Sequence, residues 1–118
     1  MVSNSQERRR FPRAKFKDTV TIHKVVESSS GNVFEVQGNA IIAQGEDVSE
    51  GGMRIEIGAN HSPTKILKLN FKLQKDNTID VYTRLVWNAK GECGLQFIVL
   101  DDEIRQQIKA YVDKKASI

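Results

Sequence analysis

Hydrophobic and polar residues alternate along four stretches in the second half of the chain. The period of two is visible along residues 53–57 and is clearer along residues 67–73. Such a period is typical of a strand with one buried face. Residues 79–87 and 93–99 repeat it, and Trp87 falls on the predicted buried face of the first of these. Because short polar turns separate the stretches, the pattern predicts antiparallel strands.

The first half of the chain carries a weaker strand pattern. Its β-branched content predicts a strand over residues 19–26, followed by a serine-rich turn at residues 28–32. Residues 33–36 and 40–43 are predicted as further short strand pieces. Regularly spaced short strands of this kind predict an all-β fold, either a barrel or a sandwich.

Apolar residues recur at helical spacing near the C-terminus. They are Leu100, Ile104, Ile108, Tyr111 and Val112. Acidic residues begin this segment and Lys114 and Lys115 end it, an order that suits the dipole of a helix. The spacing predicts one amphipathic helix over residues 102–115, and we expect its apolar stripe to cover one mouth of a barrel.

The length of 118 residues indicates a single domain. No apolar run approaches the ~20 residues of a membrane-spanning helix, and no apolar stretch follows the N-terminal arginines as in a secretory signal. The single cysteine, Cys93, cannot form an internal disulfide, which fits a reducing compartment and a cytoplasmic location. Residues 1–7 are polar and are expected to form a flexible tail.

The formal net charge of +3 is unevenly distributed. Residues 1–17 hold six basic side chains and one acidic one, a local net of +5, whereas the rest of the chain holds twelve basic and fourteen acidic ones, a net of −2. A platform for a long nucleic acid would continue its basic stripe around the domain, because affinity grows with the number of phosphates neutralised. The distribution therefore favours a small anion or a local patch.

The basic arm contains two arginines four residues apart, Arg9 and Arg13. Pro12 blocks a continuing helix and pushes Phe11 toward extended conformations. In an extended chain the two arginines point to the same side across ~13 Å, about the size of a dinucleotide. Arginine can donate paired hydrogen bonds to phosphate or to the O6/N7 edge of guanine. Alone, such a run also fits a solvated tail or a patch for RNA or acidic lipid.

A second polar motif occupies residues 47–52. Asp47 and Ser49 have short acceptor side chains that bond to nearby amides, and Gly51 and Gly52 permit positive φ and the close approach of another group. Free amides in such a turn would form an anion site, while the Asp47 carboxylate could accept from guanine or hold an arginine in place. Alone, these residues also fit an ordinary hairpin connection.

The remaining chemical candidates are weak. His23 and His61 have no familiar metal-ligand spacing with Cys93 or with carboxylates, and the carboxylates are scattered without a visible acid and base pair. Cys93 shares its parity with apolar neighbours and is expected in the core. Trp87 fits packing in the core or at the barrel edge, with base stacking as an alternative. We therefore expect no metal, no cofactor and no enzymatic activity.

Together, the two polar motifs resemble those of the PilZ domain, a family of bacterial receptors for the second messenger cyclic di-GMP. The family is marked by RxxxR followed by D/NxSxxG. The matching residues are Arg9, Arg13, Asp47, Ser49 and Gly52. Residues 85–87 and 94–97 also resemble the strands that close the barrel of this family, so the resemblance extends over nearly the whole chain.

The resemblance implies an all-β fold, a six-stranded antiparallel PilZ-type barrel with one C-terminal helix. Residues 8–118 would form one domain, with a flexible arm over residues 8–17, the barrel over residues 18–99 and the helix over residues 101–115. The segment 24–38 is longer than the usual connection in the family, which leaves the register of the early strands open.

The resemblance also implies a ligand and the residues that bind it. The cyclic di-GMP contacts would be Arg8, Arg9, Arg13, Asp47, Ser49, Gly51 and Gly52. An arginine directly before RxxxR accompanies an intercalated ligand dimer in this family, so Arg8 favours two ligands per chain. Ligand binding would order the arm against the barrel, and we expect the signal to pass to an unidentified partner protein.

Two other interpretations remain open. One is a PilZ-like protein-interaction domain without a ligand, against which the intact motifs argue. The other is a basic-arm binder of RNA or acidic membrane, which predicts steep salt dependence and indifference to base identity.

Overall fold

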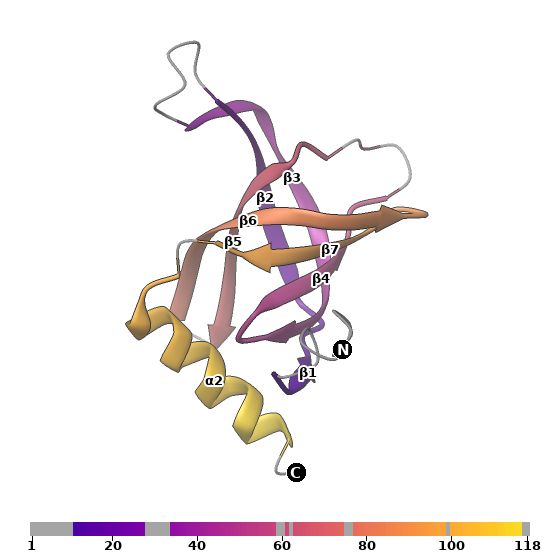
Figure 1. Ribbon diagram of the computed structural model, residues 1–118. Helices are drawn as coiled ribbons and strands as arrows, with labels where there is room; N and C mark the ends of the chain where they lie inside the picture. The colour runs from indigo at the N-terminus through magenta and orange to yellow at the C-terminus, as the bar shows by residue number, and fades with distance from the viewer. Residues whose placement is uncertain are drawn as a thin grey trace, which may run out of the picture.

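Seven strands and one helix make up the described part of the chain (Figure 1). The computed structural model describes residues 11–27, 34–58, 61, 63–74, 77–98 and 100–116. The elements are β1 (Arg13–Lys15), β2 (Thr19–Glu27), β3 (Phe34–Ser49), β4 (Gly52–Glu56), β5 (Ile66–Gln74), β6 (Asn77–Ala89), β7 (Glu92–Phe97) and α2 (Asp102–Ala116).

The sheet closes on itself as a barrel. Its strand order is β1-β3-β2-β5-β6-β7-β4, and β4 also pairs with β3. Strands β2 to β7 therefore form a ring of six, and their described pairings are antiparallel. β1 lies outside the ring as an added strand on β3. The prediction of a six-stranded antiparallel barrel with a C-terminal helix is confirmed.

β3 is one strand of 16 residues, where the sequence predicted two short pieces. Its first part pairs with β2, and its last part pairs with β1 and β4. This change of partners keeps the chain extended even where the side-chain pattern is not that of a strand. The β2–β3 register shifts between Ile22 and Lys24, and Gly38 on the opposite strand has a φ of 74°. A bulge therefore interrupts the hairpin, which extends beyond the ring in Figure 1.

Alternating apolar side chains fill the interior of the barrel. Among the buried residues are Val20, Ile22, Met53, Ile55, Leu67, Leu69, Phe71, Ile79, Val81, Cys93 and Leu95. Burial of a large aliphatic or aromatic side chain stabilises a fold by about 1.5–3 kcal/mol, so this cluster is the main source of the barrel's stability. Its members come from β2, β4, β5, β6 and β7 at the spacing of two that the sequence shows.

Trp87 departs from the predicted pattern. The β6–β7 register shifts between Leu85 and Trp87, because Leu85 pairs with Leu95 and Trp87 already pairs with Gly94. The extra residue, Val86, moves the next side chain to the other face of the sheet. Trp87 is 40% exposed, so the prediction that it shares the inward face of β6 is wrong.

Helix α2 packs on the barrel beside β1, β3 and β5 (Figure 1). Ile108 and Val112 are buried in the core cluster. The Asp101 carboxylate accepts a hydrogen bond from the Ile104 amide at 2.8 Å and so caps the helix at its N-terminus. The apolar stripe predicted from the sequence is thus the face that contacts the barrel. In the described part of the chain, no helix combines the length and the apolar content that crossing a bilayer requires.

Candidate ligand-binding site

A backbone ladder joins the two sequence motifs. β1 pairs with the end of β3 so that Arg13 lies opposite Ser49, Ala14 opposite Val48, and Lys15 opposite Asp47. Ala14 and Val48 are buried, which fixes the register of this short pairing. Residues 34 positions apart in the sequence are thereby placed side by side.

Asp47 holds Arg13 in place. One carboxylate oxygen of Asp47, Oδ1, accepts from Arg13 Nε at 2.9 Å and lies 2.8 Å from Arg13 Nη2. The other oxygen, Oδ2, accepts from Arg54 Nε at 2.9 Å. This hydrogen bond is the main cause that raises the pKa of Arg54 above its usual value. Of the two roles considered for Asp47, holding an arginine is the one seen in the structure.

The turn after Asp47 is tighter than predicted. β3 continues to Ser49 and β4 begins at Gly52, so only two residues connect them. The Ser49 hydroxyl accepts hydrogen bonds from the Gly51 amide at 3.1 Å and from the Gly52 amide at 3.3 Å. These two amides already have a partner within the turn, so they are not the free donors that were predicted for an anion site.

Contacts, and not φ, constrain the two glycines, and the constraint is much stronger at Gly52. The described glycines with positive φ are Gly38, Gly58 and Gly91, so Gly51 and Gly52 do not use the positive φ that glycine permits. A Cβ on Gly52 would lie 2.0 Å from the carbonyl oxygen of Leu95, so β4 and β7 can approach only without a side chain there. A Cβ on Gly51 would lie 3.1 Å from the ring of Phe11.

A cleft of about 490 Å³ lies between the motifs and the β6–β7 hairpin. Its lining residues are Phe11, Arg13, Ser49, Gly51, Gly52, Arg84, Val86, Trp87, Gly94, Leu95 and Gln96. The volume is in the range of small-molecule sites. Among the predicted site residues, Arg13, Ser49, Gly51 and Gly52 line this cleft. Asp47 is not among the lining residues, but its carboxylate contacts Arg13. Arg8 and Arg9 lie outside the described residues.

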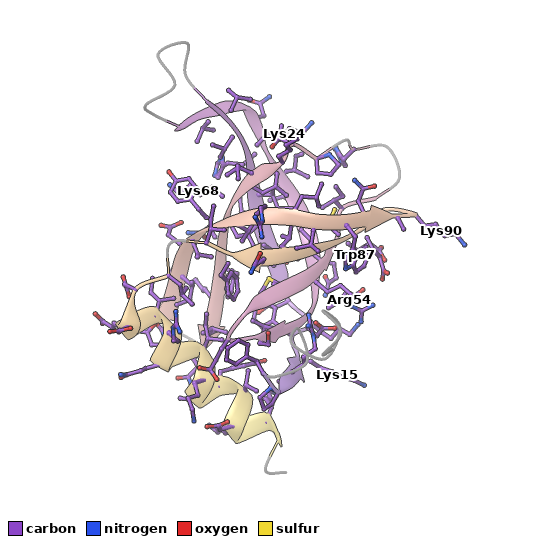
Figure 2. All side chains as sticks on the ribbon, viewed as in Figure 1. Lys15, Lys24, Arg54, Lys68, Trp87 and Lys90 are labelled. Atoms are coloured by element: carbon purple, nitrogen blue, oxygen red, sulfur yellow. The ribbon has the colours of Figure 1, made fainter. Side chains whose placement is uncertain are left out.

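Sequence reasoning did not predict the wall of the cleft formed by β6 and β7. Arg84 donates a hydrogen bond to Gln96 across these strands, and both line the cleft. The indole of Trp87 lies over Gly94, where an added Cβ would meet Nε1 at 2.1 Å. Figure 2 shows Trp87 on the same side of the barrel as Arg54. Trp87 was considered for base stacking, but no motif marked Arg84, whose place depends on closure of the barrel.

Several other titratable groups in the described part of the chain lie apart from the cleft lining. Cys93 is buried in the core, and burial raises the pKa of its thiol. Glu46, Glu56 and Glu92 have carboxylate oxygens within 4.8 Å of one another, so the fold brings together acids that the sequence scatters. Lys17 forms an ion pair with Glu46, and Arg54 lies 3.4 Å from Glu92. These cations offset part of the repulsion in the acidic cluster.

Comparison with solved structures shows the fold. The Bacillus subtilis inhibitor of motility MotI/DgrA aligns over 93% of this chain with a TM-score of 0.71 and 16% identity, and the chain spans about half (51%) of MotI. The PilZ domain of Escherichia coli YcgR, solved with c-di-GMP, aligns over 93% of this chain and 92% of its own length with a TM-score of 0.62 and 11% identity. The PilZ domain of CeSA from a cellulose-synthesizing bacterium aligns over 86% and 95% with a TM-score of 0.59 and 12% identity.

Comparison at the sequence level identifies the family. No curated protein matches the chain. The model of the PilZ domain family, by contrast, matches residues 7–114, which include both polar motifs, the barrel and most of the C-terminal helix. The chain therefore belongs to the PilZ domain family.

Proposed function

We propose that this protein is a receptor for cyclic di-GMP. The observation that carries the proposal is the β1–β3 ladder, which places Arg13 of the first motif beside Ser49 of the second on one cleft. Family membership supports the same ligand, and the related PilZ domain of E. coli YcgR was solved with c-di-GMP.

Arg13 provides the recognition chemistry in this proposal. Its guanidinium has five N–H donors, and Asp47 engages only the Nε and Nη2 groups. The side chain is 45% exposed and lines the cleft, so the remaining donors can reach a phosphate or the O6/N7 edge of guanine. Arg84 supplies a second cation on the opposite wall, and Trp87 offers an aromatic surface for a base. Arg8 and Arg9 would complete the clasp as the family motif implies.

Ligand binding is proposed to order the N-terminal arm. Arg13–Lys15 pair with β3, and in this proposal the ligand-dependent step falls on the arm residues that precede them. Binding free energy that differs between two arrangements of the arm is what makes the ligand a signal. We propose a cytoplasmic, non-enzymatic effector whose altered surface is recognised by a partner protein.

The described part of the arm does not resemble a free polybasic patch. Arg13 is paired with Asp47, and Lys17 is paired with Glu46. Each pair neutralises a charge that RNA or an acidic membrane would otherwise attract. This arrangement favours a built site for one small ligand over a general affinity for polyanions.

Isothermal titration calorimetry with cyclic di-GMP and cyclic di-AMP tests the proposal. Four or five charge-assisted hydrogen bonds of about 1.5–3 kcal/mol each, opposed by the cost of ordering, lead us to expect a submicromolar to low micromolar Kd. Cyclic di-AMP should bind far more weakly, because adenine lacks the O6 acceptor. A Kd for cyclic di-GMP above about 100 micromolar would favour the ligand-free interaction domain. Equal binding of both dinucleotides, lost steeply with added salt, would favour the basic-arm interpretation.

A further inference from the structure

Arg54 lies next to the candidate site. It is on β4, where its backbone pairs with Asp47 on β3 and with Gly94 on β7. Trp87 pairs with the same Gly94 from the other side, and Figure 2 labels both side chains. Arg54 is nevertheless absent from the described residues that line the cleft. Its side chain contacts the neighbouring acids Asp47 and Glu92, and we infer that its effect on a ligand acts through such a neighbour.

The Asp47 carboxylate is that neighbour. It divides its two oxygens between two arginines, with Oδ1 serving Arg13 and Oδ2 serving Arg54. A carboxylate held at both oxygens has its plane fixed, and here that plane sets the direction in which Oδ1 meets Arg13. The Asp47 side chain is only 18% exposed, so water competes little for these contacts.

Arg54 also offsets negative charge around Asp47. The oxygens of Glu46, Glu56 and Glu92 lie within 4.8 Å of one another. Arg54 faces this cluster through Glu92, at 3.4 Å, while it donates to Asp47. Without Arg54, the described cations paired with these acids and Asp47 would be Lys17 on Glu46 and Arg13 on Asp47. Arg13 would then be attracted toward the acids and away from the cleft.

We propose that Arg54 is a positioning residue for cyclic di-GMP, because it holds Asp47 so that Arg13 presents its remaining donors to the cleft. This inference rests on the proposed function, since it concerns the same site. It assigns a binding role to a residue that belongs to neither RxxxR nor D/NxSxxG and that does not itself line the cleft.

Calorimetry on a set of variants tests the role of Arg54. Arg54→Gln should weaken cyclic di-GMP binding about tenfold, because the second hydrogen bond to Asp47 is lost together with a charge. Arg54→Lys should recover part of the affinity, with a loss of about threefold, since lysine keeps the charge but not the guanidinium geometry. The matched control is Arg105→Gln on the exposed face of α2, which removes the same charge and should bind like the wild type.

A double-mutant cycle separates positioning from general damage to the fold. If Arg54 acts through Asp47, Arg54→Gln should have little further effect in an Asp47→Asn background. An NMR spectrum of the arginine Nε–H groups adds a readout without ligand, because the Arg13 resonance should shift in Arg54→Gln. Should Arg54→Gln fail to fold, the partial loss in Arg54→Lys carries the same test.

The outcomes distinguish the two proposals. Wild-type affinity in Arg54→Gln, or losses that simply add in the double variant, would overturn the role of Arg54 and leave the receptor function standing. No binding of cyclic di-GMP by the wild type would overturn the receptor function, and the role of Arg54 with it.

Discussion

The hydroxyl of Tyr111 on α2 donates a hydrogen bond to the backbone carbonyl of Lys15 on β1 at 3.2 Å. The next residue, Phe16, packs its ring edge-to-face against two other rings. Its ring centroid lies 6.0 Å from that of Tyr111 and 5.4 Å from that of Phe71 in the barrel. The C-terminal helix is therefore attached to the same strand that carries Arg13. A change in the position of β1 would be transmitted to α2 through these contacts.

The Tyr111→Phe variant tests this attachment. Loss of one hydrogen bond should lower the free energy of unfolding by about 1 kcal/mol at pH 7, measured by urea denaturation. The pKa of Tyr111 is raised, mainly by burial and further by Asp18. A raised pKa means that the folded state favours the neutral phenol. The contribution of neutral Tyr111 to the free energy of unfolding is therefore fully present below the ordinary pKa of about 10 and is lost at higher pH. The difference in unfolding free energy between wild type and variant should therefore shrink above pH 10. A constant difference would argue against a stabilising role of the neutral Tyr111 hydroxyl.

Arg13→Ala should weaken cyclic di-GMP binding by about 1.5–3 kcal/mol, because a charge-assisted contact is removed. The fold should change little, since the Arg13–Asp47 pair is partly exposed and such pairs contribute about 0–1 kcal/mol. Calorimetry and thermal unfolding measure the two effects. Arg9→Ala is expected to lose a similar amount of affinity, and full binding after both changes would count against the clasp.

Gly52→Ala and Gly51→Ala form a matched pair at the turn. The added Cβ at position 52 would meet the Leu95 carbonyl at 2.0 Å, and this backbone oxygen can move only if β4 and β7 separate. We expect a loss of about 3 kcal/mol in unfolding free energy for Gly52→Ala. At position 51 the nearest group is the Phe11 ring at 3.1 Å, which can rotate away, so the loss should stay below about 1 kcal/mol. Equal losses in urea denaturation would contradict this assignment.

Trp87 is the single tryptophan of the chain and lines the cleft. A purine bound there should alter its emission, so titration with cyclic di-GMP should change the fluorescence with the same midpoint as calorimetry. The Arg13→Ala variant should move both midpoints together. Unchanged emission at a ligand concentration that saturates the calorimetric signal would place the ligand elsewhere.

Arg8→Ala addresses the number of ligands. The family resemblance associates this position with an intercalated dimer, so the wild type should bind two molecules per chain and the variant one. Calorimetric stoichiometry and the mass of the complex measure this directly. The same stoichiometry in both proteins would remove the role assigned to Arg8.

The sequence was informative wherever side-chain pattern alone decides the structure. The period of two along residues 67–73 and the helical spacing from Ile104 to Val112 depend on local burial, and both elements form as predicted. The bulge at Val86 has no local signal, because it arises from how β6 meets β7. It is this bulge that moves Trp87 from the predicted interior to the cleft.

The site was predictable only as far as its motifs. Arg13, Ser49, Gly51 and Gly52 were identified from the two polar motifs and their resemblance to those of the PilZ domain, and they meet on one cleft. Arg84 and Arg54 could not be identified in this way. Each lies on the polar face of a strand, where an arginine is ordinary, and each gains its place only when the ring of strands closes. Asp47 and Arg54 become partners because β3 and β4 pair in the folded barrel, and no sequence motif links them.

β1 and β2 share β3 as their common partner, with Arg13 opposite Ser49 at one end and Glu27 opposite Phe34 at the other. The site therefore lies at the opposite end of β3 from the connection between β2 and β3. A reporter domain inserted between Glu27 and Phe34 would sit at the far end of the ladder from Arg13. The protein thus offers a position for building a genetically encoded sensor without altering the residues proposed to bind cyclic di-GMP.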